Sequence, residues 1–234
     1  MKNDFSIESF FVFPIYKIRV DPNSYDKEKI INDILYNKSL KNTRQNKFEN
    51  SLFKSFIHHS YQDFDNVNFR AINYEKLVSI YSEIFDDFFN KEINTIKTFN
   101  FEFEIINYTA MSEGQYFPAH NHPTDDFAAV HYLNFKDDHV PTLFHNPATF
   151  APFLKYMRPD LANILDTTHK HNQYMWQHFA YKVEEDDMLI FPSALDHEIK
   201  AQGPTKEPRI TIATNLKIVP PTQEKHISEG NEVT

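Results

Sequence analysis

The sequence predicts an α+β fold in which two N-terminal helices precede a β-sandwich or jelly roll. Apolar residues recur at helical spacing in two stretches of residues 25–89, and from residue 99 onward they alternate at strand spacing. Hydrophobic residues make up 41% of the 234 residues and aromatic residues 15%, which is enough to bury a sizeable core. Helices followed by a run of short strands are typical of an α+β arrangement.

The N-terminal part of the chain is expected to contain one strand and two helices. Phe10–Val20 is rich in aromatic and β-branched residues, and Pro14 interrupts this strand. Tyr25–Asn37 has apolar residues at helical spacing, and Tyr74–Phe89 has a clear apolar stripe. Residues 38–69 are polar with scattered aromatics, and their pattern allows no assignment.

The remaining strands are expected after residue 99, beginning with the alternating stretch 99–105. Further short strands are expected at Phe127–Phe135, Thr142–Phe144, Tyr174–Tyr181, Met188–Phe191 and Arg209–Ile218. An insertion interrupts the series, and we expect a helix over Phe150–Leu165 and a substrate lid formed by the insertion.

This pattern predicts a single domain over residues 1–221. Residues 1–98 would form the N-terminal strand and the supporting helices. Residues 99–218 would form the β core, with the insertion at about 147–173, and residues 222–234 would form a polar tail.

The composition excludes several classes of function. The net charge of −9 argues against a nucleic-acid backbone as the main partner, because that partner requires a basic surface. The chain has no cysteine, so a metal must be held by histidines and carboxylates. The N-terminus lacks the apolar stretch of a signal peptide, and no segment has the length of a membrane span. We therefore expect a soluble cytoplasmic protein. The sequence does not indicate its oligomeric state.

Histidines and carboxylates in the second half of the chain form candidate metal ligands. His120 and His122 are spaced i, i+2, so on one strand both side chains would point to the same face. His197 follows a later strand and offers a third ligand, while Asp125 and Asp126 are alternative carboxylate ligands. Three protein ligands on one face leave positions open, as a non-haem Fe(II) oxygenase requires.

A candidate carboxylate-binding group lies on the last expected strand. Arg209 and Thr211 alternate with Ile210 and share one face, so a guanidinium and a hydroxyl can bind one carboxylate. A strand with a metal-binding histidine followed by a strand with an inward arginine is the arrangement needed to chelate a 2-oxo acid. A surface arginine near Glu207 is the alternative interpretation.

The remaining histidines are weaker candidates for metal ligands. His169 and His171 repeat the i, i+2 spacing, so a second metal site is conceivable there. We expect His169, His171 and His178, together with Tyr174 and Trp176, to be solvent-exposed or to face the substrate. His58, His59 and His226 are expected at the surface.

Several stretches of the chain resemble one known family. INY…GQYFPAHNH (residues 106–122) is similar to the pattern NY…GxxYxxHxD, VHYLN (130–134) to a YLN strand, and DMLIFPS…H…RIT (187–211) to GDxLxFPS…H…RxS. Order and spacing agree over about residues 100–218. The chain thus resembles the 2-oxoglutarate/Fe(II) oxygenases, in particular their prolyl-4-hydroxylase-like branch. FVFPI (11–15) also resembles the opening strand of a bacterial and phage subgroup.

The resemblance implies a double-stranded β-helix, or jelly roll, with N-terminal supporting helices. It implies a hydroxylase that uses Fe(II), 2-oxoglutarate and O₂ on a peptide or a small molecule. His120 and His197 would be iron ligands, with His122 at the position of the family's carboxylate. The distal carboxylate of 2-oxoglutarate would be bound by Arg209, Thr211 and Tyr132, with Tyr108 as a further pocket residue.

Two departures from the family pattern stand out. His122 replaces the usual aspartate, and Asp125 or Asp126 could supply a carboxylate in its place. Asp186 replaces a usual glycine but can still form a turn. A jelly-roll binding module without turnover is one alternative function. A cupin-like metalloenzyme that does not use 2-oxoglutarate, and so does not need Arg209, is another.

Overall fold

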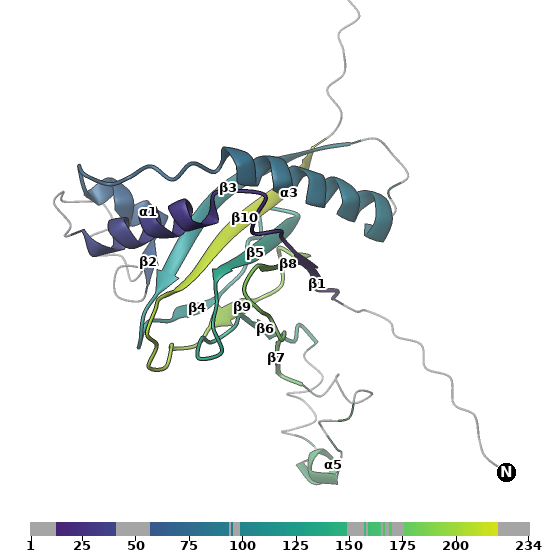
Figure 1. The fold of residues 1–234 in the computed structure, drawn as a ribbon. Coiled ribbons are helices and arrows are strands. Elements are labelled where there is room, and N and C mark those ends of the chain that lie inside the picture. Colours follow the sequence, from purple (N-terminus) through teal and green to yellow (C-terminus); the bar gives the residue numbers. More distant parts are fainter. Residues whose placement is uncertain are drawn as a thin grey trace, which may run out of the picture.

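Two antiparallel sheets, with helices on one side, make up the part of the chain that a computed structural model describes (Figure 1). The described residues are 13–40, 57–93, 95, 99–148, 157, 159–164, 166, 169 and 176–219. The expected tail and most of the expected helix over Phe150–Leu165 lie outside them, as do His171, Tyr174 and His226.

The larger sheet has six strands in the order β1-β8-β5-β10-β3-β2, and the smaller has four in the order β4-β9-β6-β7. The six strands are β1 (Tyr16–Arg19), β2 (His58–His59), β3 (Asn100–Met111), β5 (Phe127–Asn134), β8 (Asp187–Pro192) and β10 (Arg209–Val219). The four strands are β4 (Phe117–His120), β6 (Leu143–His145), β7 (His178–Ala180) and β9 (His197–Ile199). All the strand pairs are antiparallel.

Two helices cover the outer face of the six-stranded sheet, α1 (Lys27–Ser39) and α3 (Glu75–Asp87) (Figure 1). Both were predicted, and both are confirmed to within a few residues. Shorter helical segments are η1 (Ser60–Asp65), η2 (Phe88–Ile93) and α5 (Pro159–Ile164). None of the described helices is long and apolar enough to cross a membrane.

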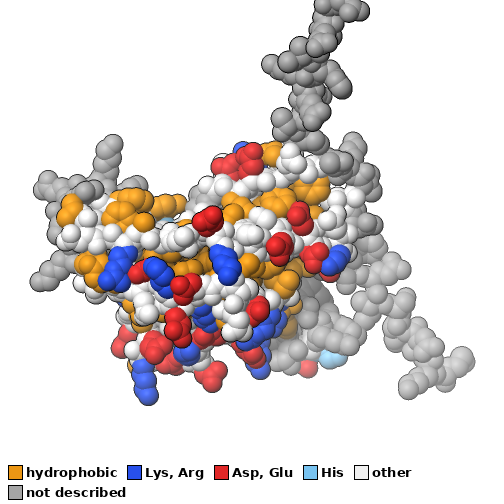
Figure 2. All heavy atoms as spheres, turned by 45° about the horizontal axis from the view of Figure 1, so that its top comes forward, with side chains coloured by type: hydrophobic (Ala, Val, Ile, Leu, Met, Phe, Trp, Pro, Cys, Tyr) orange, Lys and Arg blue, Asp and Glu red, His pale blue; other side chains and the backbone are white. Residues whose placement is uncertain are grey.

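The main core lies between these helices and the sheet. The apolar stripe of α3 buries Leu77, Tyr81 and Phe85, and the ring of Phe85 contacts that of Phe103 on β3 at a centroid distance of 5.8 Å. Full burial of one such side chain contributes roughly 1.5–3 kcal/mol. Charged side chains of both signs are interspersed on the outside of this layer (Figure 2), as expected for solvent-facing helix surfaces.

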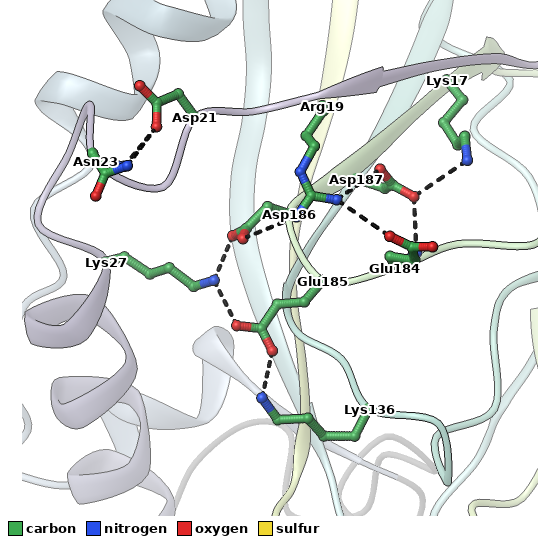
Figure 3. A network of polar contacts seen from close by, with 10 residues as sticks. All are labelled: Lys17, Arg19, Asp21, Asn23, Lys27, Lys136, Glu184, Glu185, Asp186 and Asp187. Carbon is green, nitrogen blue, oxygen red and sulfur yellow. Dashed lines mark hydrogen bonds and ion pairs between the residues drawn. The ribbon is translucent and has the colours of Figure 1, made fainter.

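Ion pairs connect the start of α1 to the turn before β8 (Figure 3). Lys27 pairs with Asp186 and, at 2.7 Å, with Glu185, whose other oxygen accepts from Lys136 at 2.6 Å. Asp186 has a φ of 71°, a left-handed conformation that aspartate tolerates better than most residues. The prediction that an aspartate can form this turn in place of glycine is thus confirmed.

Some elements differ from the sequence-based expectations. Strand β2 was not predicted, and β4 and β9 were expected only as strands that carry metal-binding histidines, because each is two to four residues long and shows no alternation of its own. The prediction that His58 and His59 lie at the surface was wrong: His59 is buried and His58 half-buried. They pair with Ala110 and Thr109 of β3, a contact distant in sequence that periodicity does not show. The domain boundaries stay a prediction.

Candidate metal centre and carboxylate pocket

Three histidines converge between the two sheets. His120 ends β4 and His197 begins β9, and the two residues pair directly across the strands, with ring centroids 4.3 Å apart. His122 lies two residues past the end of β4, so the prediction that it shares a strand with His120 was wrong. Its backbone N–H donates to the carbonyl of Ser193 at 2.9 Å. One ring nitrogen from each histidine lies within 4.8 Å of the others.

Backbone carbonyls determine which nitrogen two of these rings present. The Nδ1–H of His120 donates to the carbonyl of Pro118 at 2.9 Å, and that of His197 to the carbonyl of Leu195 at 2.9 Å. A carbonyl can only accept, so Nε2 of each neutral ring keeps its lone pair, as a metal ligand must. Burial lowers the pKa of His120, and burial together with the neighbouring His120 lowers that of His197 to about 3. These rings are therefore neutral at pH 7.

The third histidine contacts an amide. Nδ2 of Asn215 lies 3.0 Å from Nδ1 of His122 and donates to Oδ2 of Asp125 at 2.7 Å. Burial, with the neighbouring His120, lowers the pKa of His122. Asp125 thus lies beside His122, and Asn215 connects the two residues. The carboxylate of Asp126 instead accepts from the backbone N–H of Ile218 at 2.7 Å.

Aromatic side chains surround the inner side of the three histidines. Phe144 and Phe191 contact the ring of His197 at centroid distances of 6.1 and 4.9 Å, and Phe117 contacts that of His120 at 4.3 Å. Both Phe144 and Phe191 are buried. The rings of His120 and His197 therefore pack against apolar side chains, which limit water on the inner side of the site.

A buried guanidinium lies on the same inner side, at the start of β10. Arg209 has 0% exposure. Its Nη atoms donate to Oγ1 of Thr211 at 3.4 Å and Oγ1 of Thr142 at 3.3 Å, and its carbon lies 5.2 Å from the ring centre of Tyr132. The Tyr132 hydroxyl donates to Thr142 at 2.9 Å.

The charge of Arg209 has no counter-charge among the described residues. No carboxylate lies within ion-pair distance of it there, and its Nε has no hydrogen-bond partner. Burial lowers the pKa of Arg209, yet a guanidinium stays protonated in proteins. An unpaired buried charge is costly, so this group fits an anionic ligand.

Tyr108 lies apart from this pocket. Its neighbour Thr109 contacts Thr211 at 2.9 Å on the inner side of the sheet, so strand alternation turns Tyr108 toward the helices. There its hydroxyl donates to Asp63 at 2.6 Å and lies 3.1 Å from Nε2 of His58. Tyr108 therefore does not contact Arg209, whereas Thr211 and Tyr132 do.

Three polar residues of this region were missed by sequence reasoning. Asn215 could have been found, because it follows Thr211 by four positions on one strand and so shares its inward face. Thr109 pairs with Thr211 across strands, and Thr142 lies just before β6. These two contacts depend on strand register, and no sequence pattern marks them.

The donor set of this centre suits a divalent metal ion. Three nitrogen ligands with open positions around them are typical of Zn²⁺ and non-haem Fe(II) sites. Together, the histidines and the buried guanidinium define a β-sheet protein whose interior can hold a metal ion and a carboxylate at once. The inward positions of β10 run from Arg209 to Asn215, so one strand contributes to both parts.

Comparison with known proteins identifies the family. Residues 107–215 match the family model described as "Putative 2OG-Fe(II) oxygenase", so this segment is similar to the 2-oxoglutarate/Fe(II) oxygenases. The family and class of enzyme predicted from the sequence are therefore confirmed. So are the cofactors of that class, which are Fe(II), 2-oxoglutarate and O₂. Among curated proteins, none matches the sequence.

Several solved structures are similar to this one. HygX from Streptomyces hygroscopicus, with nickel and 2-oxoglutarate bound, has 10% identity and a TM-score of 0.50, covering 90% of this chain and 84% of its own. A Pseudomonas putida prolyl-4-hydroxylase has 9% identity and a TM-score of 0.49, covering 88% and 93%. For an oxidoreductase of the 2OG-Fe(II) oxygenase family from Burkholderia pseudomallei, the values are 10% and 0.37, and the match spans 58% of each chain.

Proposed function

We propose that this protein is a hydroxylase in which His120, His122 and His197 hold iron, while Arg209, Thr211 and Tyr132 bind the distal carboxylate of 2-oxoglutarate. The buried guanidinium without a counter-charge is the observation that carries this proposal. A dicarboxylate that chelates iron at one end and meets Arg209 at the other would satisfy both groups.

The double-stranded β-helix is part of the same proposal. The two antiparallel sheets enclose the histidines and the guanidinium, and the likeness to HygX extends over 90% of this chain. We assign residues 1–221 to one oxygenase domain. The order of the motifs over residues 106–211 favours the prolyl-4-hydroxylase-like branch, with a peptide or a small molecule as substrate.

When bound, iron and 2-oxoglutarate supply the oxidation, in which one atom of O₂ enters succinate and the other enters the substrate. The residues of the chain fix the geometry. Pro118 and Leu195 orient two imidazoles through their carbonyls, and Thr142 positions the guanidinium. The apolar wall of Phe144 and Phe191 limits water near His197.

His122 needs one adjustment to serve as a ligand through Nε2. Its Nδ1 must then carry the proton and donate it, so Asn215 must present its amide oxygen instead of its nitrogen. A neutral ligand at this position leaves the ferrous site one unit more positive than an aspartate would. That turn of the Asn215 amide gives up the hydrogen bond from Nδ2 to Asp125, but the carboxylate still lies beside His122 and can balance part of the charge.

Succinate formation from 2-oxoglutarate tests the proposal. The purified chain should produce succinate only when Fe(II) and O₂ are present, and Arg209→Met should reduce this sharply. Arg70→Met is the matched control, because Arg70 is half-exposed and pairs with Asp33 outside the pocket. Metal binding without succinate formation would favour a binding module. A metal-dependent reaction that survives Arg209→Met would favour a cupin-like enzyme.

A further inference from the structure

A second group of metal-ligating side chains lies on the outward face of the four-stranded sheet. It consists of His145 on β6, His178 on β7 and Glu198 on β9. One ligand atom from each lies within 4.8 Å of the others. Nε2 of His145 is 3.1 Å from Oε1 of Glu198, and the His145 and His178 ring centroids are 4.6 Å apart.

Strand register explains why these three side chains meet. His145 pairs directly with His178, and Leu143, two residues before His145, pairs with Glu198. The neighbours of two of these residues, Phe144 and His197, face inward, so His145 and Glu198 face outward. The group therefore lies back to back with the three-histidine centre and is separate from it.

We propose that His145, His178 and Glu198 form a second metal site, for a divalent cation of the zinc class. Two imidazoles and a carboxylate are common Zn²⁺ ligands, and water would complete the coordination. The carboxylate supplies a negative charge that the inner three histidines lack. This inference is independent of the proposed oxygenase function.

The present neighbours of the group leave it accessible to a metal ion. Lys200 pairs with Glu198 at 2.7 Å, but the Lys200 side chain is 60% exposed, so this ion pair is weak. A divalent cation would replace the ammonium group. Partial desolvation and the neighbouring His145 hold the pKa of His178 below its usual range, which favours the neutral ring that a metal requires.

Equilibrium dialysis of the full chain against Zn²⁺ tests the proposal. Two zinc ions per chain are expected in the wild type, and one in His178→Ala or Glu198→Gln. Lys200→Ala should tighten the weaker site by about two- to five-fold, because it removes the competing cation. His169→Ala, a change at an exposed histidine elsewhere, should still bind two ions.

Variants at the inner centre separate the two sites. His197→Ala should lose the inner ion and keep the ion that depends on His178, whether or not the chain is an oxygenase. Circular dichroism checks that each variant is folded, and substitution of the exposed His178 should not unfold the chain. Zinc stoichiometry that is the same in wild type, His178→Ala and Glu198→Gln would overturn the second site.

Discussion

Each side of the six-stranded sheet buries a charged side chain, but the two side chains differ in their hydrogen-bond partners. On the helix side, Asp63 accepts from the hydroxyl of Tyr108 at 2.6 Å and from Nδ2 of Asn37 at 3.0 Å, with Nε2 of His58 at 3.5 Å. On the inner side, Arg209 is fully buried, with weak hydroxyl partners, and no described carboxylate pairs with it. A buried group with complete partners stabilises the fold, whereas one without them is available to a ligand.

On the strand pair β3 and β10, residues that face the helices and stabilise the fold alternate with residues that face the pocket. β3 turns Tyr108 toward the helices and Thr109 toward the pocket, and β10 turns Ile212 and Thr211 in the same two directions. Substitutions on the helix side should therefore change the free energy of unfolding. Substitutions on the inner side should change ligand affinity. Substitutions of both kinds test this division between stability and ligand binding.

Phe85→Ala on the helix side should be the most destabilising of these changes. Phe85 is fully buried among the rings of Phe88, Phe101 and Phe103, and its loss leaves a cavity. We expect the free energy of unfolding to fall by about 3–5 kcal/mol. Urea denaturation measures this change. A 2-oxoglutarate affinity that fell as much as the stability, under conditions where the variant is folded, would contradict the division.

Arg209→Met should have the opposite effect: it should lower the affinity for 2-oxoglutarate and leave the stability of the chain intact. Replacing an unpaired buried charge with an apolar side chain should leave the ligand-free chain at least as stable as the wild type. Affinity for 2-oxoglutarate should fall by about 2–5 kcal/mol, or roughly 30- to 5,000-fold. Calorimetry on the metal-loaded chain measures the affinity and urea denaturation the stability. A clearly less stable variant would mean that Arg209 has a structural role.

Tyr108→Phe removes one partner of the buried Asp63 without creating a large cavity. Leaving the carboxylate short of a hydrogen bond should cost about 1–3 kcal/mol of stability. Because Tyr108 faces the helices, the affinity for 2-oxoglutarate should stay within about two-fold of wild type. If that affinity falls strongly while stability is kept, Tyr108 belongs to the pocket, as the family resemblance implied.

Acidification should destabilise the chain through His131 on the helix side. Burial, with the nearby Lys27, lowers the pKa of His131 to about 3, whereas an unfolded histidine has a pKa near 6.5. Between these values the unfolded chain binds more protons, so this contribution is present above pH 6.5 and is lost as the pH falls. From pH 7 to 5.5 it amounts to about 1 kcal/mol. His131→Leu should show a smaller pH dependence in urea titrations, and an unchanged slope would contradict the assignment.

Sequence reasoning predicted the two helices and most of the candidate site, because both produce local patterns in the sequence. The apolar stripe of residues 74–89 marks α3, and the alternation of Arg209 with Thr211 places both on the inner face. The register between strands that are distant in sequence produces no such local pattern. The position of His122 beyond β4, the pairing of His58 with Ala110 and the contact of Arg209 with Thr142 all depend on it.

An anaerobic titration of the apoprotein with Fe(II), then 2-oxoglutarate, tests most directly whether the three histidines and Arg209 form one site. Bound together, the two ligands should produce a weak visible charge-transfer band that neither gives alone. The band should be lost in His197→Ala and need far more 2-oxoglutarate in Arg209→Met. Arg70→Met should behave as wild type. Iron that binds without any band, or a band that needs no more 2-oxoglutarate in Arg209→Met than in wild type, would contradict a single site formed by the three histidines and Arg209.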